Sequence, residues 1–507
     1  MSGTMRSAPE PRTLMNGSHL VHARQFIIGP SAVSATNLTV NETLGPSWQM
    51  ARHADLPAAF ASAGDRELLC LGELLDPHNP RRSNAEVLQS LLKVTHDFAQ
   101  FEAASAGLAG RWIVVARLGG MLRLYPDATG LKSVFYLREA SGRVWAASQP
   151  GIFVEALGIQ QDEEIRAKFA AHSQSATSWP CEVTPYVGVR QLLPNHYLDL
   201  HTGTARRFWP TAAIQPRSLD DAAAEIAQLL HGAIAAIVAR GTAALPLTAG
   251  YDSRTLFACA GELRASIPLF RVQGHHLPWY DTAIPRKLVR QYGLAIREIK
   301  PRRYDQESWQ IMQRNISHLW WDPGDYMVRT FASLNVKYIL LGLLSEIGRC
   351  FYYRDGQHPQ EVTGRSLAAT AFYRDHPLAI EAFERWLAGV PRHAAPAVLD
   401  LLYWEHRAGN WASMMATAYD AFVEPAAPYN CRALLTTMLG VDLAHRREPY
   451  ELHRRICAVA APETLRYPFN FSWRDAIQDS VVSMTPWRIR VAVSRLRKRI
   501  AGFDLSY

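Results

Sequence analysis

Cysteine is scarce in this sequence and long apolar runs are missing, and each gap excludes a class of protein. The six cysteines stand far apart and none forms a C-x-x-C pair, so neither a zinc site nor a disulfide framework is indicated. No window approaches the ~18 uncharged apolar residues that span a membrane. The first two dozen residues contain Arg and His without an apolar core, which does not fit a secretory signal. A cytoplasmic protein is therefore expected.

The composition is that of an ordinary globular chain with a basic end. Of the 507 residues, 48% are hydrophobic and 20% are charged, and the length has room for about three domains of ~150 residues. The formal net charge is +8, and residues 487–500 carry much of the excess, with Ile489, Val493, Leu496 and Ile500 at helical spacing. A terminal helix that docks one apolar face is the favoured interpretation, and contact with an anionic membrane surface is the alternative. No aromatic-and-basic module accompanies this helix, so no nucleic-acid partner is expected.

The first third of the chain predicts an α+β domain with packed sheets. Between Gln25 and Gly158, short apolar runs alternate with turns, and one helix is expected over residues 83–101. The runs lie at residues 26–28, 68–71, 111–116, 121–125, 133–137 and 143–147. The last four runs are spaced like neighbouring strands of an antiparallel meander. Residues 159–211 follow as a connector, with a helix at 163–172 and short strands at 187–192 and 196–200.

After Pro210 the pattern changes to alternating helices and strands. Residues 219–240 carry two aspartates in the first turn and then an apolar stripe, which predicts an amphipathic helix. Later strands are predicted at 267–272, 295–299 and 336–342, with helices between them. Such alternation predicts a parallel, doubly wound sheet, whose ligands bind beyond the carboxyl ends of the strands.

One stretch, residues 245–259, breaks from an apolar run into a turn of small residues and resumes as a helical pattern. Thr248, Ala249 and Gly250 are small enough for backbone N–H groups to close around an anion, and the following helix would point its positive end at the same place. Asp252 and Ser253 stand at the helix start, where a carboxylate can hold Mg²⁺. An ordinary strand-to-helix turn capped by Asp252 or Ser253 is the alternative.

The segment 248–253, Thr-Ala-Gly-Tyr-Asp-Ser, resembles the S-G-G-x-D-S pyrophosphate loop of the ATP pyrophosphatases. Its surroundings are similar to the asparagine synthetase family, in which a class II amidotransferase domain precedes the ATP domain. The further segments similar to that family lie, in its order, at residues 124–136, 146–148, 188–197, 339–348 and 423–432. The match covers about residues 25 to 475, and this collinearity is more specific than any single motif.

The resemblance implies an α+β amidotransferase-like sandwich followed by an α/β doubly wound parallel-sheet ATP-pyrophosphatase domain with a helical C-terminal part. The implied divisions are 25–158 for the amidotransferase-like domain, 159–211 for the connector, 212–475 for the ATP domain and 476–507 for a basic C-terminal helix. The oligomeric state stays open.

The implied reaction is adenylation of a carboxylate by ATP, with release of pyrophosphate, followed by displacement of AMP by an amine. ATP and Mg²⁺ are the implied cofactors, and a small-molecule or peptide carboxylate and an amine donor are the implied substrates. Asp252 and Glu346 are assigned as metal ligands. The ATP-binding residues assigned are Leu247, Thr248, Ala249, Gly250, Asp252, Ser253, Arg254, Val272 and Gly342. The catalytic residues assigned are Glu346, Arg407 and Arg466.

In the loop, Thr248 replaces the family's Ser and Ala249 its first Gly, and three further departures bear on the chemistry. Glutamine hydrolysis in this family needs a cysteine that is exposed as the new N-terminus. This chain has Ser2 at that position, so glutaminase activity is not expected. Leu343 stands where the family has an acidic residue, and Pro468 stands where it has a lysine. Arg466, Arg474 or Arg407 is a candidate to replace that lysine, although a guanidinium fork is not equivalent to an ammonium.

Two alternatives therefore remain beside an amide-forming ligase. One is an asparagine synthetase that uses ammonia, and the other is a non-catalytic nucleotide-binding scaffold of a biosynthetic complex. Two weaker groups of residues are also open. The pair His275 and His276 is favoured as surface or core, and the run 404–411 either packs as a helix or faces a substrate, with Arg407 and Trp411 on one side.

Overall fold

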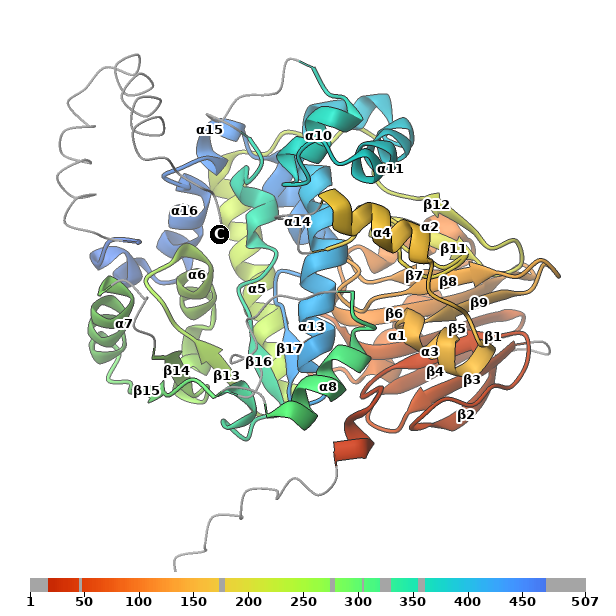
Figure 1. Cartoon of the computed structure of the whole chain (residues 1–507). Coiled ribbons are helices and arrows are strands. Elements are labelled where there is room, and N and C mark those ends of the chain that lie inside the picture. The colour runs from red at the N-terminus through yellow and green to blue at the C-terminus, as the bar shows by residue number, and fades with distance from the viewer. Residues whose placement is uncertain are drawn as a thin grey trace, which may run out of the picture.

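Two six-stranded antiparallel sheets build the N-terminal half of the protein (Figure 1). The computed structural model describes residues 17–44, 48–172, 178–273, 279–302, 305–319, 330–353 and 361–470. The first sheet has the order β10 (Arg190–Gln191), β8 (Phe135–Arg138), β9 (Val144–Ala147), β1 (Phe26–Gly29), β3 (Trp48–His53) and β2 (Leu38–Leu44). The second has the order β12 (Thr204–Arg207), β11 (His196–Asp199), β7 (Met121–Pro126), β6 (Ala109–Leu118), β5 (Arg66–Leu75) and β4 (Ala58–Ala63).

The two sheets enclose one apolar core and cover a second. Ile28 of the first sheet and Leu71 of the second are buried in the same cluster. Because side chains alternate along a strand, Cys70 faces the other way and packs in a cluster with α1 (Asn84–Val94) and α2 (Phe98–Ser105). The prediction of an α+β segment with packed sheets is confirmed.

The helix predicted over residues 83–101 is two helices. Ser83 and Glu86 form a capping box that starts α1, and the helix ends at Thr95, whose backbone is extended. Asp97 then caps α2 by accepting the Gln100 N–H. The single-helix prediction was wrong because the second cap, a side-chain bond to the backbone, restarts the helix in a new direction.

The four apolar runs between residues 111 and 147 form two hairpins in different sheets. β6 pairs with β7 in the second sheet, and β8 pairs with β9 in the first. Between the hairpins, the buried Asp127 carboxylate accepts the backbone N–H groups of Thr129, Leu131 and Lys132 at 3.1, 2.9 and 2.8 Å. The meander prediction was wrong because this tied loop carries the chain from one sheet to the other.

The expected connector, residues 159–211, pairs with both sheets. After α3 (Pro150–Leu157) and α4 (Glu163–His172), β10 forms an edge of the first sheet. β11 and β12 extend the second sheet beyond β7. The two sheets are therefore completed by residues that follow the predicted amidotransferase-like segment.

A five-stranded parallel sheet forms the second half. Its order is β15 (Ile296–Ile299), β14 (Leu269–Val272), β13 (Ala243–Pro246), β16 (Tyr338–Leu340) and β17 (Glu424–Ala426). In chain order this reads 3-2-1-4-5, so the direction of winding reverses between β13 and β16. The predicted doubly wound parallel sheet is confirmed, and its switch point lies beside the end of β13.

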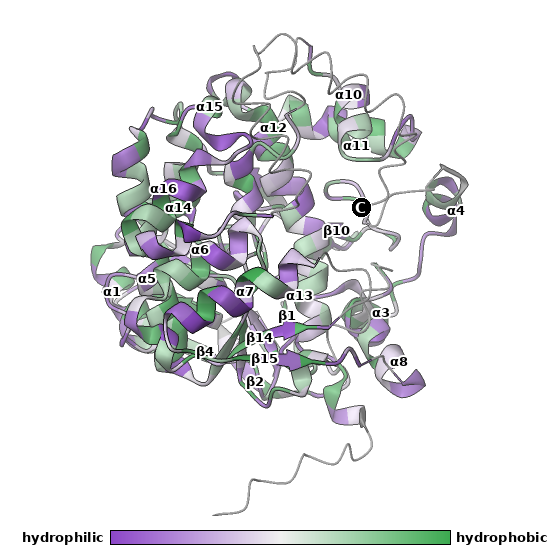
Figure 2. Ribbon diagram, turned by 90° about the vertical axis from the view of Figure 1, so that its left-hand side faces the viewer, coloured by the Kyte–Doolittle hydropathy of each residue, from purple (hydrophilic) through white to green (hydrophobic). Residues whose placement is uncertain are grey.

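Helices connect the parallel strands. They are α6 (Tyr251–Cys259) after β13, α7 (Tyr280–Gln291) after β14 and α8 (Gln306–Asn315) after β15. Figure 2 shows α7 near β14 and β15, with hydrophilic and hydrophobic residues alternating along it. Its Ile284, Leu288 and Val289 are buried, which is the face that an amphipathic helix turns to a sheet.

The remaining described residues are mainly helical, as predicted. They form α10 (Gly364–Thr370), α11 (Pro377–Ala388), α12 (Val398–Leu401), a π-helix (Leu402–Ala412), α13 (Ser413–Tyr419), α14 (Arg432–Gly440), α15 (Leu443–Arg446) and α16 (Glu451–Ala460). Short 3-10 turns lie at Gly17–Leu20, Gly261–Ala265, Ser345–Arg349, Arg392–Ala397 and Pro462–Arg466.

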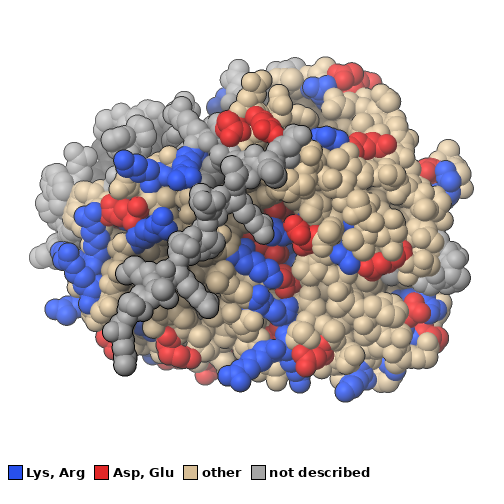
Figure 3. All heavy atoms as spheres, turned by 90° about the horizontal axis from the view of Figure 1, so that it is seen from below, with Lys and Arg blue, Asp and Glu red and all other residues tan. Residues whose placement is uncertain are grey.

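The long helix α5 (Leu219–Arg240) appears where it was predicted. By length and composition this helix could cross a membrane, which corrects the expectation that no stretch of the chain comes close to doing so, but 61% of its apolar 18-residue stretch is buried inside the protein, as in a core helix. Seen from below, the surface carries Lys and Arg interspersed with Asp and Glu (Figure 3).

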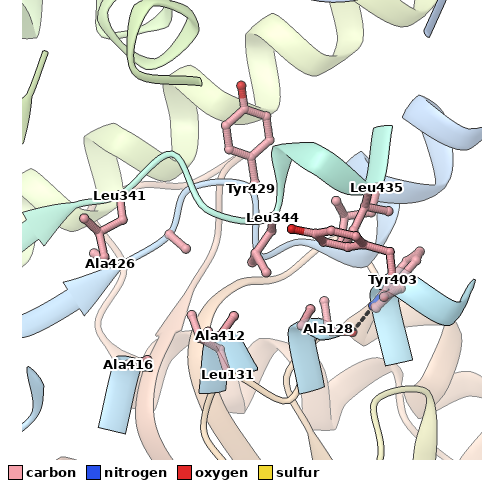
Figure 4. Close-up of a cluster of buried hydrophobic side chains, with 14 of the residues drawn as sticks. Ala128, Leu131, Leu341, Leu344, Tyr403, Ala412, Ala416, Ala426, Tyr429 and Leu435 are labelled. Atoms are coloured by element: carbon pink, nitrogen blue, oxygen red, sulfur yellow. Dashed lines mark hydrogen bonds between the residues drawn. The ribbon is translucent and has the colours of Figure 1, made fainter. Parts of the chain in front are cut away.

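The two halves share an apolar interface. Figure 4 shows Ala128 and Leu131, from the loop after β7, beside Leu344, which directly precedes the 3-10 turn Ser345–Arg349, and Tyr403 from the π-helix. The Trp404 indole N–H donates to the Ala128 carbonyl at 2.7 Å. This shared core fixes the position of the parallel sheet relative to the sandwich.

Candidate functional site

The loop between β13 and α6 lies at the switch point of the parallel sheet. Leu247 is buried, and its N–H donates to the Phe270 carbonyl of β14 at 2.9 Å. Val272 is the last residue of β14. Two of the predicted ATP-binding residues therefore lie at the carboxyl ends of adjacent strands.

Gly342 brings the end of β16 against the start of α6. A Cβ atom at this position would lie 2.6 Å from the Asp252 Cβ and 3.0 Å from its carbonyl carbon. Only glycine allows two backbones to approach this closely. The structure thus places Gly342 and Asp252, both predicted site residues, in direct contact.

The small residues of the loop bond to one another. The Thr248 N–H donates to the Ser253 hydroxyl at 3.0 Å, and the two hydroxyls lie 2.9 Å apart. The Gly250 N–H donates to the Thr248 hydroxyl at 3.1 Å. Gly250 is the N-cap of α6 and no side chain caps the helix, so capping by Asp252 or Ser253, the alternative for this turn, is wrong.

One N–H group of the loop already binds a carboxylate. The Ala249 N–H donates to Asp281 Oδ1, from the first turn of α7, at 2.9 Å. Burial raises the pKa of Asp281. An internal anion therefore occupies a donor that an anion-binding loop would offer to a phosphate.

Asp252 and Glu346 lie together and share an arginine. Arg349 Nη2 is 3.1 Å from Asp252 Oδ2 and 3.2 Å from Glu346 Oε1. The Ser345 hydroxyl donates to the other oxygen of Asp252. Burial raises the pKa of Asp252 to about 7, and the Glu346 charge acts in the same direction.

Asp252 and Glu346 fit the protein ligands of a Mg²⁺ ion that is bound together with a nucleotide. Mg²⁺ on ATP is commonly held by one or two carboxylates, with phosphates and water as the other ligands. Glu346 Oε2 is buried and has no hydrogen-bond partner among the described residues. In the described part of the chain, no group of three or more His, Cys, Asp or Glu side chains could hold a metal, so the nucleotide would have to supply the remaining ligands.

Arg254 is buried under the C-terminal segment. Its guanidinium donates to the carbonyls of Thr464, Tyr467 and Pro468 and stacks on Phe469, 3.8 Å from the ring centroid. Burial lowers the pKa of Arg254 to about 10. The structure thus places this predicted ATP-binding residue as an anchor for residues 464–469.

Arg466 lies at the end of the 3-10 turn Pro462–Arg466 and is exposed. No ion pair joins it to another described residue. The same segment approaches the loop farther on, where the Asn470 N–H donates to the Ala249 carbonyl at 3.2 Å. Arg474, a second candidate for the missing lysine, lies outside the described residues.

Arg407 packs among aromatic side chains. Its guanidinium is 4.8 Å from the Trp411 ring centroid and 5.3 Å from that of Phe351, and it adjoins the Tyr403 hydroxyl. Burial, and next the Glu346 charge, raise the pKa of Tyr403. The charges of both Arg407 and Glu346 therefore act on the Tyr403 hydroxyl.

The rest of the run 404–411 packs in the core. Trp404, His406 and Asn410 are buried, and the Asn410 amide donates to the Cys181 carbonyl at 3.1 Å. Helix packing is thus the role of these three residues, whereas Arg407 and Trp411 are partly exposed. His275 and His276 lie outside the described residues, as does the basic segment 487–500.

Sequence reasoning missed Arg349, Ser345 and the contact of Asp281 with the loop. Arg349 follows Glu346 at i+3 spacing, which brings side chains together on one side of a helical turn. Asp281 follows the second parallel strand, where a ligand-facing residue is expected. These two signals could have identified both residues.

The chain's cysteines offer no nucleophile for glutamine hydrolysis. All six are unpaired and buried. Burial raises the pKa of every one of them, for example to about 12 in Cys350 and about 11 in Cys431. A buried neutral thiol is inert compared with a thiolate.

Comparison with known proteins gives no family assignment. No protein-family model matches the sequence, and no curated protein matches it. One solved structure, titled as the allosteric regulatory enzyme of purine biosynthesis, is similar at 12% identity and a TM-score of 0.25, over 59% of this chain and 74% of that one. A second, the glutamine phosphoribosylpyrophosphate amidotransferase from B. subtilis complexed with ADP and GMP, is similar at 10% identity and a TM-score of 0.24, over 66% and 72%. Neither similarity is strong enough to carry an argument about this chain.

Proposed function

We propose that this protein is an ATP-dependent amide-forming ligase that activates a carboxylate as acyl-AMP and releases pyrophosphate. One observation carries the proposal: the 248–253 loop, which contains Asp252, lies against Gly342 and near Glu346. This contact is at the switch point of a parallel sheet with the strand order 3-2-1-4-5. Ligands of such sheets bind in the crevice at this point. The sequence similarity to a pyrophosphate loop supplies the class of ligand.

The loop's donors suit a leaving pyrophosphate. Backbone N–H groups at the start of α6 would face the charge that develops on the departing phosphates, and fixed donors of this kind need no reorganisation during the reaction. Asp252 and Glu346 would hold a Mg²⁺ ion, and the ion would neutralise part of that negative charge. The Val272 backbone, at the end of β14, is the proposed contact for adenine.

The amine is proposed to come from a source other than glutamine. Since every cysteine of the chain is buried with a raised pKa, the thiolate that would release ammonia is missing. A free amine or ammonia would then attack the acyl carbon and displace AMP.

The direct test is acid-dependent exchange of labelled pyrophosphate into ATP, measured over a panel of small-molecule and peptide carboxylates. Asp252→Ala should abolish the exchange. Asp220→Ala removes an exposed carboxylate whose partner is Arg455 on the surface and should leave it unchanged. An absence of exchange with every acid, in a protein that binds ATP, would contradict the ligase proposal.

A second candidate, a nucleotide-binding scaffold without catalysis, is favoured by one specific feature. The Ala249 N–H and the two carboxylates are occupied by internal partners, Asp281 and Arg349. Leu343 and Pro468 also lack the charges of the acidic residue and the lysine that they replace. ATP binding by calorimetry with no exchange activity would support the scaffold.

A further inference from the structure

At the switch point, the Arg349 side chain bridges the carboxylates of Asp252 and Glu346. In the described residues, the ion pairs of Asp252 and of Glu346 both end at Arg349. Arg349 comes from the same 3-10 turn as Glu346 and reaches across to the first turn of α6. The bridge therefore joins the two elements that meet at the switch point.

Three of the four carboxylate oxygens are taken by internal donors. Asp252 accepts from the Ser345 hydroxyl on one oxygen and from Arg349 on the other, and Glu346 Oε1 faces Arg349 at 3.2 Å. Glu346 Oε2 has no described partner. A metal ion that bridged both carboxylates would need oxygens that the guanidinium now uses.

Arg349 is largely buried in this position. Its side chain is only 16% exposed, and its guanidinium lies 5.3 Å from the Tyr450 ring centroid. The Arg349 Nε is buried, and its N–H is without an acceptor among the described residues.

We propose that Arg349 occupies the cation position of the nucleotide-free site and keeps divalent metal out until a phosphate binds. Repulsion between the fixed guanidinium and an incoming divalent cation disfavours the metal alone. A phosphate offers the guanidinium a bidentate partner at least as good as the carboxylates, so it draws Arg349 aside and brings the metal with it. Arg349 is thus a positioning residue that makes metal binding depend on nucleotide. This inference rests on the proposed function.

The test is titration of the full chain with Mn²⁺ without nucleotide, followed by electron paramagnetic resonance of the free ion. The wild-type protein should show no Mn²⁺ binding at concentrations at which Arg349→Gln binds it, with a gain in affinity of at least roughly tenfold. Arg349→Lys keeps the charge and should stay near the wild type. Arg455→Gln removes an exposed arginine from a surface ion pair and should change nothing.

Equal Mn²⁺ affinity in the wild type and Arg349→Gln would overturn the proposal. If Arg349→Gln does not fold, the wild type alone decides, since Mn²⁺ binding that is as tight without ATP as with a non-hydrolysable ATP analogue would also overturn it. The outcome is separable from the proposed function. A protein that gains Mn²⁺ binding in Arg349→Gln but never exchanges pyrophosphate would keep this inference and lose the ligase.

Discussion

Gly342 allows the segment after β16 to pack directly against the start of α6. In Gly342→Ala, the added methyl group would lie 2.6 Å from the Asp252 Cβ, so strand and helix must separate. We expect a loss of roughly 1–3 kcal/mol in the free energy of unfolding together with weaker ATP binding. Gly107→Ala is the matched control, because nothing lies within 4 Å of a Cβ built there. Unchanged stability and ATP affinity in Gly342→Ala would show that the approach is not needed.

Lys132 is expected to make the free energy of unfolding change with pH in the alkaline range. Burial lowers the pKa of Lys132 to about 8, whereas an unfolded lysine titrates near ~10.4. Between these values the unfolded chain binds more protons than the folded one, so stability rises with pH. Compared with Lys132→Met, the wild type should gain roughly 1–3 kcal/mol over this range.

The measurement is urea unfolding of both proteins at several pH values above neutrality. The relevant quantity is the difference between the two, since other groups that titrate in this range cancel. Lys93→Met, at an exposed position of α1, is the control for a lost lysine. A constant difference between Lys132→Met and the wild type would mean that the amine stays protonated in the folded protein.

At the scale of elements, the first turn of α7 competes with ligand for the 248–253 loop. Asp281 binds the Ala249 N–H at 2.9 Å, and a carboxylate and a phosphate cannot use this donor together. Asp281→Asn removes the charge but keeps the shape. We expect inorganic pyrophosphate and ATP to bind about threefold to tenfold more tightly, as measured by isothermal titration calorimetry.

Asp375→Asn serves as the control for Asp281→Asn. It removes one negative charge from an exposed ion pair with Arg365 and tests whether net charge alone changes affinity. Weaker binding in Asp281→Asn would mean instead that Asp281 supports the bound nucleotide.

Elements with strong local signals could be predicted from the sequence, and so could the loop of the site. The helix 219–240, with its acidic first turn and apolar stripe, has the predicted bounds. The doubly wound sheet followed from the alternation of strands and helices, and Gly342 and Asp252 lie together as a shared sheet edge requires. The strands β2, β3, β4, β12 and β17 were missed.

The remaining features depend on side chains that bond to the backbone, some of them close by in the chain and others far away. The break at Thr95 and the crossing at Asp127 each come from side chains that bond to the backbone. Arg254 was assigned to ATP binding from its place beside the loop, and nothing in the sequence indicated its carbonyl acceptors, which lie more than two hundred residues away. No local pattern reveals such a partner.

At the scale of the whole molecule, a buried ion cluster joins the sandwich to the parallel-sheet half. Asp420, after α13, accepts two bonds from Arg111 of β6, one of them at 2.8 Å. Lys132 Nζ lies 3.7 Å from the same carboxylate. All three side chains are buried, so the cluster is shielded from bulk solvent and spans the interface.

Asp420→Asn should therefore destabilise the entire protein. It leaves the charges of Arg111 and Lys132 buried without their anion, and removal of one partner from a buried ion pair typically costs about 3–5 kcal/mol. Thermal unfolding followed by circular dichroism should show a large fall in the midpoint. Asp220→Asn, which breaks an exposed pair with Arg455, should change stability by less than about 1 kcal/mol. If the two halves are held together mainly by the apolar contacts around Leu131 and Tyr403, Asp420→Asn will instead unfold close to the wild-type midpoint.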